Sequence, residues 1–420
     1  MFEKVEWAEG IDVYIRPTDQ FKTVTMMMQW ETPYEVERAA HRAVLSNVLQ
    51  DSTKKYPTYR AYKQQLDALY GSTMFTAVAK RKEMHRFVLM SETVHEQLIG
   101  ENGHLEAWLD FIRETVVAPN VTDGAFDADT VRRERRSVIE RLDAVYDDKR
   151  RFARRRLLEL MRPGEAVSQS TYGTKEALER VTPESLYTEF QRMIEEDHLS
   201  IYIVGDVDVA SIETMVREAL PFERREARAE RPVSLRRGDV QEVVEYQQMN
   251  QGQLHIGYYA PITRDDERFP AAQVANGLLG GFAHSKLFMN VREKESMAYS
   301  ISSQYLSQYG LLLIGAGIDA ELSDKAIRLI TEQVEAIQRG DIHAREMKQT
   351  KALLANGIRS ALDTPRGQMM VYDQFKEQFP NFSADALIER WDAVTKEEVV
   401  DVANEWTREV IYLLRGGEKQ

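Results

Sequence analysis

Apolar positions along the chain follow two periods, one typical of strands and one typical of helices. Short apolar runs with the length of strands occur at residues 13–16, 23–30, 84–91 and 309–318. Apolar residues spaced for one face of a helix occur at residues 38–50, 59–70, 104–117 and 270–279. We expect 13–16 and 23–30 to pair as a hairpin, with 243–259 as its counterpart. This mixture predicts an α+β fold in which helices pack on one face of an antiparallel-rich sheet.

The longest helical pattern covers residues 129–161 and is stopped by Pro163 and Gly164. It is rich in arginine, as in VRRERRSVIERL and RRFARRRLLEL. Because acidic residues are interleaved with the arginines, a surface helix with ion pairs is favoured over a helix that binds nucleic acid.

A linker is predicted at residues 221–241, between two halves of similar length. The stretch PFERREARAERPVSLRRGDV has six Arg, four acidic residues and two Pro, and few residues suited to a core. Its acids alternate with its arginines, which favours an exposed linker over a basic ligand patch. The predicted halves are residues 1–220 and residues 242–420.

The ends of the two halves resemble each other, which indicates an internal duplication. Thr182 and Thr395 are each followed two residues later by Glu, then by an amphipathic helix and an apolar strand that ends at Gly. In both places the Thr suits a helix N-cap and the Glu suits the first turn. The offset is 395 − 182 = 213 for the Thr pair and 411 − 201 = 210 for Ile201 against Ile411. We therefore expect two similar sandwich halves.

Composition and charge exclude several classes of function. The chain has 420 residues, and its 55 Lys and Arg against 68 Asp and Glu give a net charge of −13. This balance argues against a general binder of nucleic acid or of an anionic membrane. The absence of cysteine excludes disulfides, Cys-ligated zinc and iron–sulfur clusters. No apolar run approaches the roughly 20 residues of a membrane helix, and the charged start MFEKVEWAEG argues against a signal peptide. We expect a cytoplasmic protein.

Residue spacing alone predicts no active site. No two of the eight histidines stand four residues apart, which is the spacing that points two imidazoles of one helix at one zinc ion. The chain has no GxSxG, no phosphate-binding P-loop and no GxGxxG. A zinc site assembled from dispersed residues is the alternative that the spacing leaves open.

The stretch NGLLGGFAHSKLFMNVREKESMAYSISSQY, residues 276–305, resembles the signature of the second half of the pitrilysin/insulinase family, which includes the mitochondrial processing peptidases. The segments NQGQLHIGYYAP and IVGDVD support this resemblance, which covers nearly the whole chain. It implies two similar α+β halves folded like half a clamshell. Two such chains enclose a chamber for unfolded peptides. Active members are zinc peptidases with HxxEH on a helix of the first half and a distal Glu on a later helix.

The chain departs from this family at the zinc site. The family motif HFLEHMLFKGT aligns with AVLSNVLQDST, so that Ala43 and Asn47 replace the two His and Ser46 replaces the general-base Glu. The distal ligand aligns with Arg141, and a one-residue slip would place Glu140 there. Without these groups, the chain lacks the ligands that would bind zinc and the base that would activate water. We therefore expect no metal in this chain and zinc on a partner.

The resemblance also assigns a substrate-binding group in the second half. Arg292 and Tyr299 match the family's Arg–Tyr pair, which binds substrate carbonyls and helps to stabilise the tetrahedral intermediate. Gly280 and Gly281 match the preceding Gly-rich loop. An Arg supplies a fixed charge with a fork of donors, and a Tyr supplies a phenolic donor. The alternative is that both side chains only hold this loop and the strand edge together.

These observations predict a non-catalytic subunit of a zinc peptidase pair for peptide processing. The chain would supply a peptide-binding chamber wall and the Arg/Tyr pair to an HxxEH-bearing homologue in a heterodimer, without nucleic acid or membrane. One alternative is a non-enzymatic homodimer that binds peptides or acts as a scaffold. Another is an active metallopeptidase with a non-standard zinc site.

Overall fold

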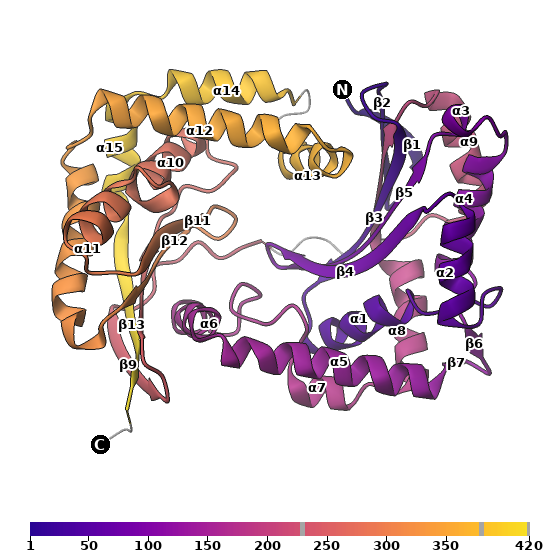
Figure 1. Cartoon of the computed structure of the whole chain (residues 1–420), viewed down its shortest axis with the longest axis horizontal. Helices are drawn as coiled ribbons and strands as arrows, with labels where there is room; N and C mark the ends of the chain where they lie inside the picture. Colours follow the sequence, from indigo (N-terminus) through magenta and orange to yellow (C-terminus); the bar gives the residue numbers. More distant parts are fainter. Residues whose placement is uncertain (227–231, 378–381, 418–420) are drawn as a thin grey trace. The chain divides into compact units, whose positions relative to one another are not determined.

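The computed structural model describes residues 1–226, 232–377 and 382–417, so residues 227–231 of the predicted linker lie outside the described residues. Two compact units emerge from the contacts, each with one main sheet (Figure 1). Unit 1 comprises Met1–Asp143, Gln169–Arg231 and Ala361–Phe375. Unit 2 comprises Ala144–Ser168, Pro232–Ser360 and Lys376–Gln420. Each unit thus includes a segment from the other half of the chain, and the boundaries at 220 and 242 stay a prediction.

The described part of unit 1 contains a six-stranded sheet in the order β1-β2-β8-β3-β5-β4. Its strands are β1 (Glu3–Ala8), β2 (Ile11–Pro17), β3 (Thr23–Pro33), β4 (Thr73–Arg81), β5 (Met84–Val94) and β8 (His198–Gly205). The helices are α1 (Val36–Val48), α2 (Tyr59–Ala68), α3 (Glu96–Ile99), α4 (His104–Val116), α5 (Ala128–Asp147), α7 (Lys175–Glu179), α8 (Pro183–Glu196), α9 (Val209–Ala219) and α13 (Pro365–Phe375). β6 (Val121–Thr122) and β7 (Ala125–Phe126) form a small separate ribbon.

The described part of unit 2 contains a five-stranded sheet in the order β11-β12-β10-β13-β9. Its strands are β9 (Gln241–Gln247), β10 (Gly252–Tyr259), β11 (Ser300–Leu306), β12 (Leu311–Ile318) and β13 (Thr407–Gly416). Its helical elements are α6 (Lys149–Met161), α10 (Phe269–Asn276), η1 (Gly277–Gly281), η2 (Leu287–Lys294), η3 (Ala320–Leu322), α11 (Ser323–Gln338), α12 (Ala344–Leu362), α14 (Ala384–Ala393) and α15 (Lys396–Asn404). No helix among the described residues is long and apolar enough to cross a membrane.

The two sheets share one topology, which confirms the predicted α+β fold with two similar halves. In unit 1 the central strand β8 runs parallel to β2 and antiparallel to β3, and β5 and β4 follow antiparallel. In unit 2 the central strand β13 runs parallel to β9 and antiparallel to β10, and β12 and β11 follow antiparallel. Ile201 of β8 and Ile411 of β13, the pair offset by 210 residues in the sequence, lie at corresponding positions of the two strands.

The predicted hairpin of residues 13–16 with residues 23–30 is wrong, because β8 lies between β2 and β3. The predicted counterpart fails in the same way, since β13 lies between β9 and β10. The reason is burial: nearly all of β8 is buried, so it needs a strand on each side and cover on both faces. The segment between β2 and β3 passes the end of β8, where the Thr18 amide donates to the Gly205 carbonyl at 2.8 Å.

The predicted single helix over residues 129–161 is also wrong, because it breaks at Asp148 into α5 and α6. The Asp148 carboxylate accepts hydrogen bonds from the backbone N–H groups of Arg150 and Arg151, both at 3.1 Å. An Asp in this role is an N-cap, and it competes with continuation of the helix. The break places α5 largely in unit 1 and α6 in unit 2.

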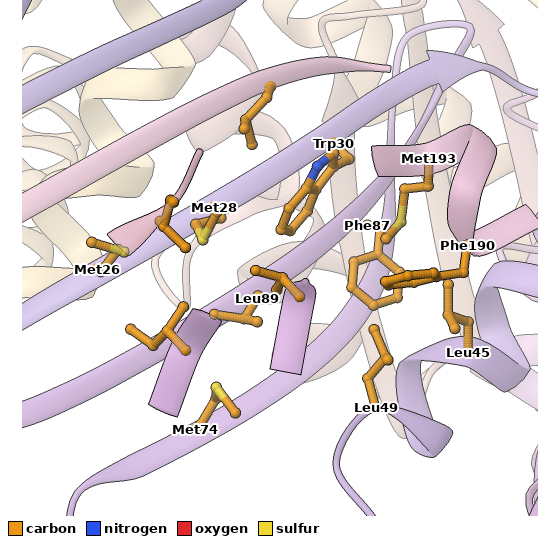
Figure 2. Packing of buried hydrophobic residues seen from close by; sticks show 14 of the residues in the cluster. Met26, Met28, Trp30, Leu45, Leu49, Met74, Phe87, Leu89, Phe190 and Met193 are labelled. Atoms are coloured by element: carbon orange, nitrogen blue, oxygen red, sulfur yellow. The ribbon is translucent and has the colours of Figure 1, made fainter. Parts of the chain in front are cut away.

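The core of unit 1 lies between one face of its sheet and the helices α1, α4, α8 and α9. Figure 2 shows alternate residues of β3 and β5 meeting side chains of α1 and α8. These residues are Met26, Met28, Trp30, Phe87 and Leu89 from the strands, Leu45 from α1, and Phe190 and Met193 from α8. Burial of a side chain such as Phe87 stabilises the fold by about 1.5–3 kcal/mol.

The second face of each sheet is covered by a helix from the other half of the chain. In unit 1, α13 packs on β8 and β3, and in unit 2, α6 packs on β10 and β13. The Tyr202 hydroxyl of β8 donates to Asp373 of α13 at 2.6 Å, and Arg86 donates to the same carboxylate at 2.6 Å. These bonds satisfy polar groups that burial on the sheet would otherwise leave unpaired.

The corresponding tyrosine of unit 2 makes the same kind of contact. The Tyr412 hydroxyl, 210 residues after Tyr202, donates to Glu245 of β9 at 2.9 Å. Arg156 of α6 donates to the other oxygen of Glu245 at 2.7 Å. In both units, therefore, a tyrosine of the central strand and an arginine share one carboxylate, and the helix from the other half supplies a member of the group.

A buried ion pair joins the end of α6 to the start of β13. Arg162 and Glu409 are 1% and 0% exposed, and Arg162 Nη1 lies 2.8 Å from Glu409 Oε2. We expect Glu409→Gln to lower the free energy of unfolding of unit 2 by about 3–5 kcal/mol, because it leaves the guanidinium buried without a counter-ion. Denaturant unfolding measures this loss. The control Glu335→Gln, in an exposed pair with Arg339, should cost less than about 1 kcal/mol, and equal losses would contradict the prediction.

Acid should destabilise unit 2 through His255 of β10, which is 3% exposed. Burial, with the charges of Arg150 and Arg154, lowers the pKa of His255 to about 3. The unfolded chain binds this proton below about pH 6.5, whereas the folded chain does not bind it until about pH 3. Stability is therefore retained above pH 6.5 and falls by about 1.4 kcal/mol per pH unit below it. Urea unfolding of wild type and His255→Gln between pH 7 and 4.5 should show a shallower fall for the variant.

Candidate functional site

Helix α1 carries Ala43, Ser46 and Asn47, the positions that the sequence resemblance aligns with two zinc ligands and a general base. Its alanines favour helix, and its apolar side packs into the core of unit 1. Ala43 is fully buried in that core, and Leu45 beside it points into the same cluster (Figure 2). Position 43 is thus a core position in this chain.

The polar groups near Ser46 are engaged by neighbouring residues. The Ser46 hydroxyl donates to the Ala43 carbonyl at 2.8 Å. The Ser46 carbonyl accepts from the Gln50 amide at 2.7 Å and from the Thr76 hydroxyl of β4. These bonds join the end of α1 to β4, the strand at one edge of the sheet, and Asn47 beside them is half-buried.

The remaining candidate ligands are dispersed or engaged elsewhere. His41 bonds to the Glu37 carbonyl at 2.8 Å and to the Ser185 hydroxyl of α8 at 2.9 Å. Arg141 is exposed on α5, with its guanidinium 5.7 Å from the centre of the Tyr172 ring. In the described ranges of the chain, no group of three or more His, Asp or Glu is placed to hold a metal ion. An alanine, a serine and an amide do not fit zinc, which takes His, Cys or carboxylate ligands.

A buried group of four charges, which the sequence did not predict, lies one turn earlier on α1. Arg38 Nε lies 2.9 Å from Glu189 of α8, and Arg38 Nη2 lies 3.2 Å from Asp197. Arg42 Nε lies 3.1 Å from Glu189, and Arg42 also pairs with Asp197. Burial, partly offset by Glu189, lowers the pKa of Arg42 to about 9. The sequence signal for this group was the presence of two arginines, Arg38 and Arg42, four residues apart on an otherwise apolar face of a predicted helix.

This charged group holds α1 in place and offers no catalytic chemistry. Arg38 also donates to Thr32 of β3 at 2.7 Å, and Arg42 donates to the His85 carbonyl of β5 at 3.3 Å. All four charged side chains are at most 5% exposed, so they have no contact with solvent through which a substrate would enter. The helix is therefore positioned by packing and by ion pairs.

The predicted substrate-binding pair lies in unit 2 and is accessible. Arg292 lies in the last turn of the short helix η2, with its guanidinium 4.6 Å from the centre of the Phe288 ring and Nε 3.7 Å from Glu293. An exposed pair at this distance adds little stability. Tyr299 is 72% exposed, and its amide donates to the Gly317 carbonyl at 2.9 Å just before β11 begins. The substrate-binding roles of Arg292 and Tyr299 stay a prediction.

The two predicted loop glycines differ in their surroundings. Gly280 is buried, and a Cβ built there would lie 2.5 Å from the Ser303 amide nitrogen of β11. Close approach of η1 to β11 therefore requires glycine at this position. Gly281 is exposed. Packing accounts for Gly280, and a contact of either glycine with substrate stays a prediction.

Comparisons with known proteins agree with this geometry. The family model described as "Peptidase M16 inactive domain" matches residues 180–354. A Bacillus subtilis protein named "Probable inactive metalloprotease YmfF" is 32% identical over 412 residues, which cover 97% of this chain and 96% of that protein. An uncharacterised zinc protease of Mycobacterium bovis is 25% identical over 297 residues, which cover 69% of this chain and 67% of that protein.

Solved structures match over the full length. The crystal structure of a conserved protein from Enterococcus faecalis has a TM-score of 0.92 at 31% identity and covers 100% of this chain and 99% of that one. A protease from Helicobacter pylori has a TM-score of 0.80 at 15% identity, covers 99% of each chain and shows the fold alone. Together these matches confirm the family resemblance carried by residues 276–305.

The packing around α1 predicts that the replaced ligand will not be restored by substitution. Ala43→His should destabilise unit 1 by about 1–3 kcal/mol or more, because the larger side chain overpacks a fully buried site. Asn47→His, at a half-buried position, should cost less. Denaturant unfolding compares the two variants, and zinc content by plasma mass spectrometry tests the triple variant with Ser46→Glu. Stoichiometric zinc in a stable triple variant would contradict this account.

Proposed function

Because the chain belongs to the peptidase M16 family and is an inactive homologue of its metallopeptidases, we propose that it is a non-catalytic subunit that binds peptide beside an HxxEH-bearing partner. One observation carries the proposal. The positions aligned with the metal ligands and base on α1 are Ala43, Ser46 and Asn47, of which Ala43 and Ser46 are buried, whereas the side chains of Arg292 and Tyr299 are exposed. The cytoplasmic location expected from the sequence stays part of the proposal.

The chemistry divides between the two chains on this proposal. Hydrolysis by a zinc peptidase needs three protein ligands, a free coordination position and a general base, all of which the partner must supply. The residues of this chain bind and orient the peptide. The guanidinium of Arg292 and the phenol of Tyr299 are donors suited to a peptide carbonyl and to the negative charge that develops on it.

The edge strand β11 supports a peptide-binding role. It is the last strand on its side of the sheet in the described part of unit 2, so its outer N–H and C=O groups face away from β12. An extended peptide adds to such an edge through main-chain hydrogen bonds. Tyr299 immediately precedes the strand and Arg292 lies on η2, which packs against it. Both side chains would then meet a peptide that lies along β11.

The test is a cleavage assay on the chain co-expressed with an HxxEH-bearing homologue of similar length from the same organism. Arg292→Ala should lower kcat/KM by about 10²-fold, the typical cost of losing one donor to the oxyanion, with the heteromer still assembled. Tyr299→Phe should lower it in the same direction, since it removes only the hydroxyl. Arg345→Ala, an exposed arginine of α12, is the matched control and should leave turnover unchanged.

Three outcomes would overturn parts of this proposal. Unchanged turnover in Arg292→Ala, with assembly intact by size-exclusion chromatography, would refute the assignment of the Arg/Tyr pair. A chain that forms no complex with the homologue yet binds peptides would favour the alternative of a non-enzymatic scaffold. Zinc on this chain alone, with peptidase activity, would favour a non-standard metal site.

A further inference from the structure

Strand β9 of unit 2 lacks the neighbour that its counterpart in unit 1 has. β2 and β9 correspond, because each is the parallel neighbour of a central strand, β8 or β13. On its outer side β2 pairs antiparallel with β1, and Lys4 of β1 forms an ion pair with Asp12 at 2.6 Å. In the described part of the chain, no strand pairs with the outer side of β9. Its outward N–H and C=O groups therefore remain available for a further strand.

The side chains on one face of β9 are exposed as well. Val244 of β9 pairs with Leu413, and Ile15 of β2 pairs with Ile203. Leu413 and Ile203 are 413 − 203 = 210 residues apart, which is the repeat offset, so Val244 occupies the position in unit 2 that Ile15 occupies in unit 1. Ile15 is 0% exposed in the core of unit 1, where α9 packs against β2, whereas Val244 is 48% exposed. Tyr246, two residues along the same face, is 40% exposed. β9 thus offers both a free edge and an apolar strip.

β9 has few of the features that prevent an edge strand from pairing with another chain. Its sequence QEVVEYQ has no proline and no lysine, and its register with β13 is regular along its whole length. One of its two acids, Glu245, is engaged by Arg156 and Tyr412 on the other face. Glu242 is the remaining charge beside Val244 and Tyr246. A strand with these properties is suited to pairing with another chain.

We propose that β9 pairs antiparallel with β9 of a second copy of this chain, about a two-fold axis that passes beside Val244. The sequence is self-complementary in this register. Glu242 opposes Tyr246 of the other copy, and Glu245 opposes Val243, so that no acid opposes an acid. Val244 opposes Val244, and the two apolar strips join into one. This contact produces a dimer and no larger assembly, because each copy of β9 has one side that no described strand pairs with, and the pairing uses it.

The pairing is independent of any catalytic partner, since it uses β9 and leaves Arg292, Tyr299 and β11 free. It joins two five-stranded sheets into one continuous sheet across the axis. Apolar cross-strand pairs of this kind contribute about 0.2–1 kcal/mol each, in addition to the main-chain hydrogen bonds of the new ladder.

The absence of cysteine allows a direct test in the full-length chain. Directly opposed residues of an antiparallel pair have Cβ atoms about 4.5–5.5 Å apart, close to the span of a disulfide. Val244→Cys should therefore give a covalent dimer as the main species under mild oxidation. Leu353→Cys, on α12 and 40% exposed, is the matched control and should remain a monomer on a denaturing gel. Tyr246→Cys should cross-link less than Val244→Cys, because it opposes Glu242.

Light scattering after size-exclusion chromatography provides the second measurement. Wild type should have twice the 48.5 kDa mass of one chain at micromolar concentration. Val244→Lys should halve the observed mass with unchanged circular dichroism, because like charges would face each other across the axis. Leu353→Lys should remain dimeric. A monomeric wild type, a dimeric Val244→Lys or equal cross-linking of Val244→Cys and the control would each overturn the proposal.

Discussion

The structure depends on the burial of a central strand on both faces in each unit. β8 is buried along nearly its whole length and β13 is buried from Glu409 to Leu414, so neither is stable with helices on one side only. The second face is covered by α13 in unit 1 and by α6 in unit 2, each from the other half of the chain. Tyr202 and Tyr412 place a hydroxyl on that face, and the carboxylates of Asp373 and Glu245 satisfy them. The duplicated topology and the divided units follow from this one requirement.

Helix α1 is held in place without a histidine or a carboxylate at positions 43, 46 and 47. Helix α1 is held by its apolar face and by the buried charges of Arg38 and Arg42 with Glu189 and Asp197. Ala43 belongs to the same apolar face of the helix. In unit 2, the guanidinium of Arg292 and the phenol of Tyr299 are exposed hydrogen-bond donors.

Comparison of the two halves separates what the fold needs from what it does not. Both units keep five strands in one order, which are the strands required to enclose the buried central strand. In unit 1, β1 pairs with the outer side of β2 and α9 packs against it, whereas no described strand pairs with the outer side of β9. Because β9 lies at the edge, its uncovered side chains do not prevent the unit from folding. Exposure of Val244 where Ile15 is buried is therefore compatible with a folded chain and indicates an interface.

The sequence by itself determined the α+β class and the duplication, because these follow from the periodicity of apolar residues and from the 210-residue offset. It did not determine strand order: β2 and β3 are adjacent in the chain, and only the tertiary need to bury β8 separates them. Nor did it reveal the break at Asp148 or the charged group around Arg42. An N-cap and a buried ion pair are recognised only from the positions of the groups that they contact, and the tertiary structure sets those positions.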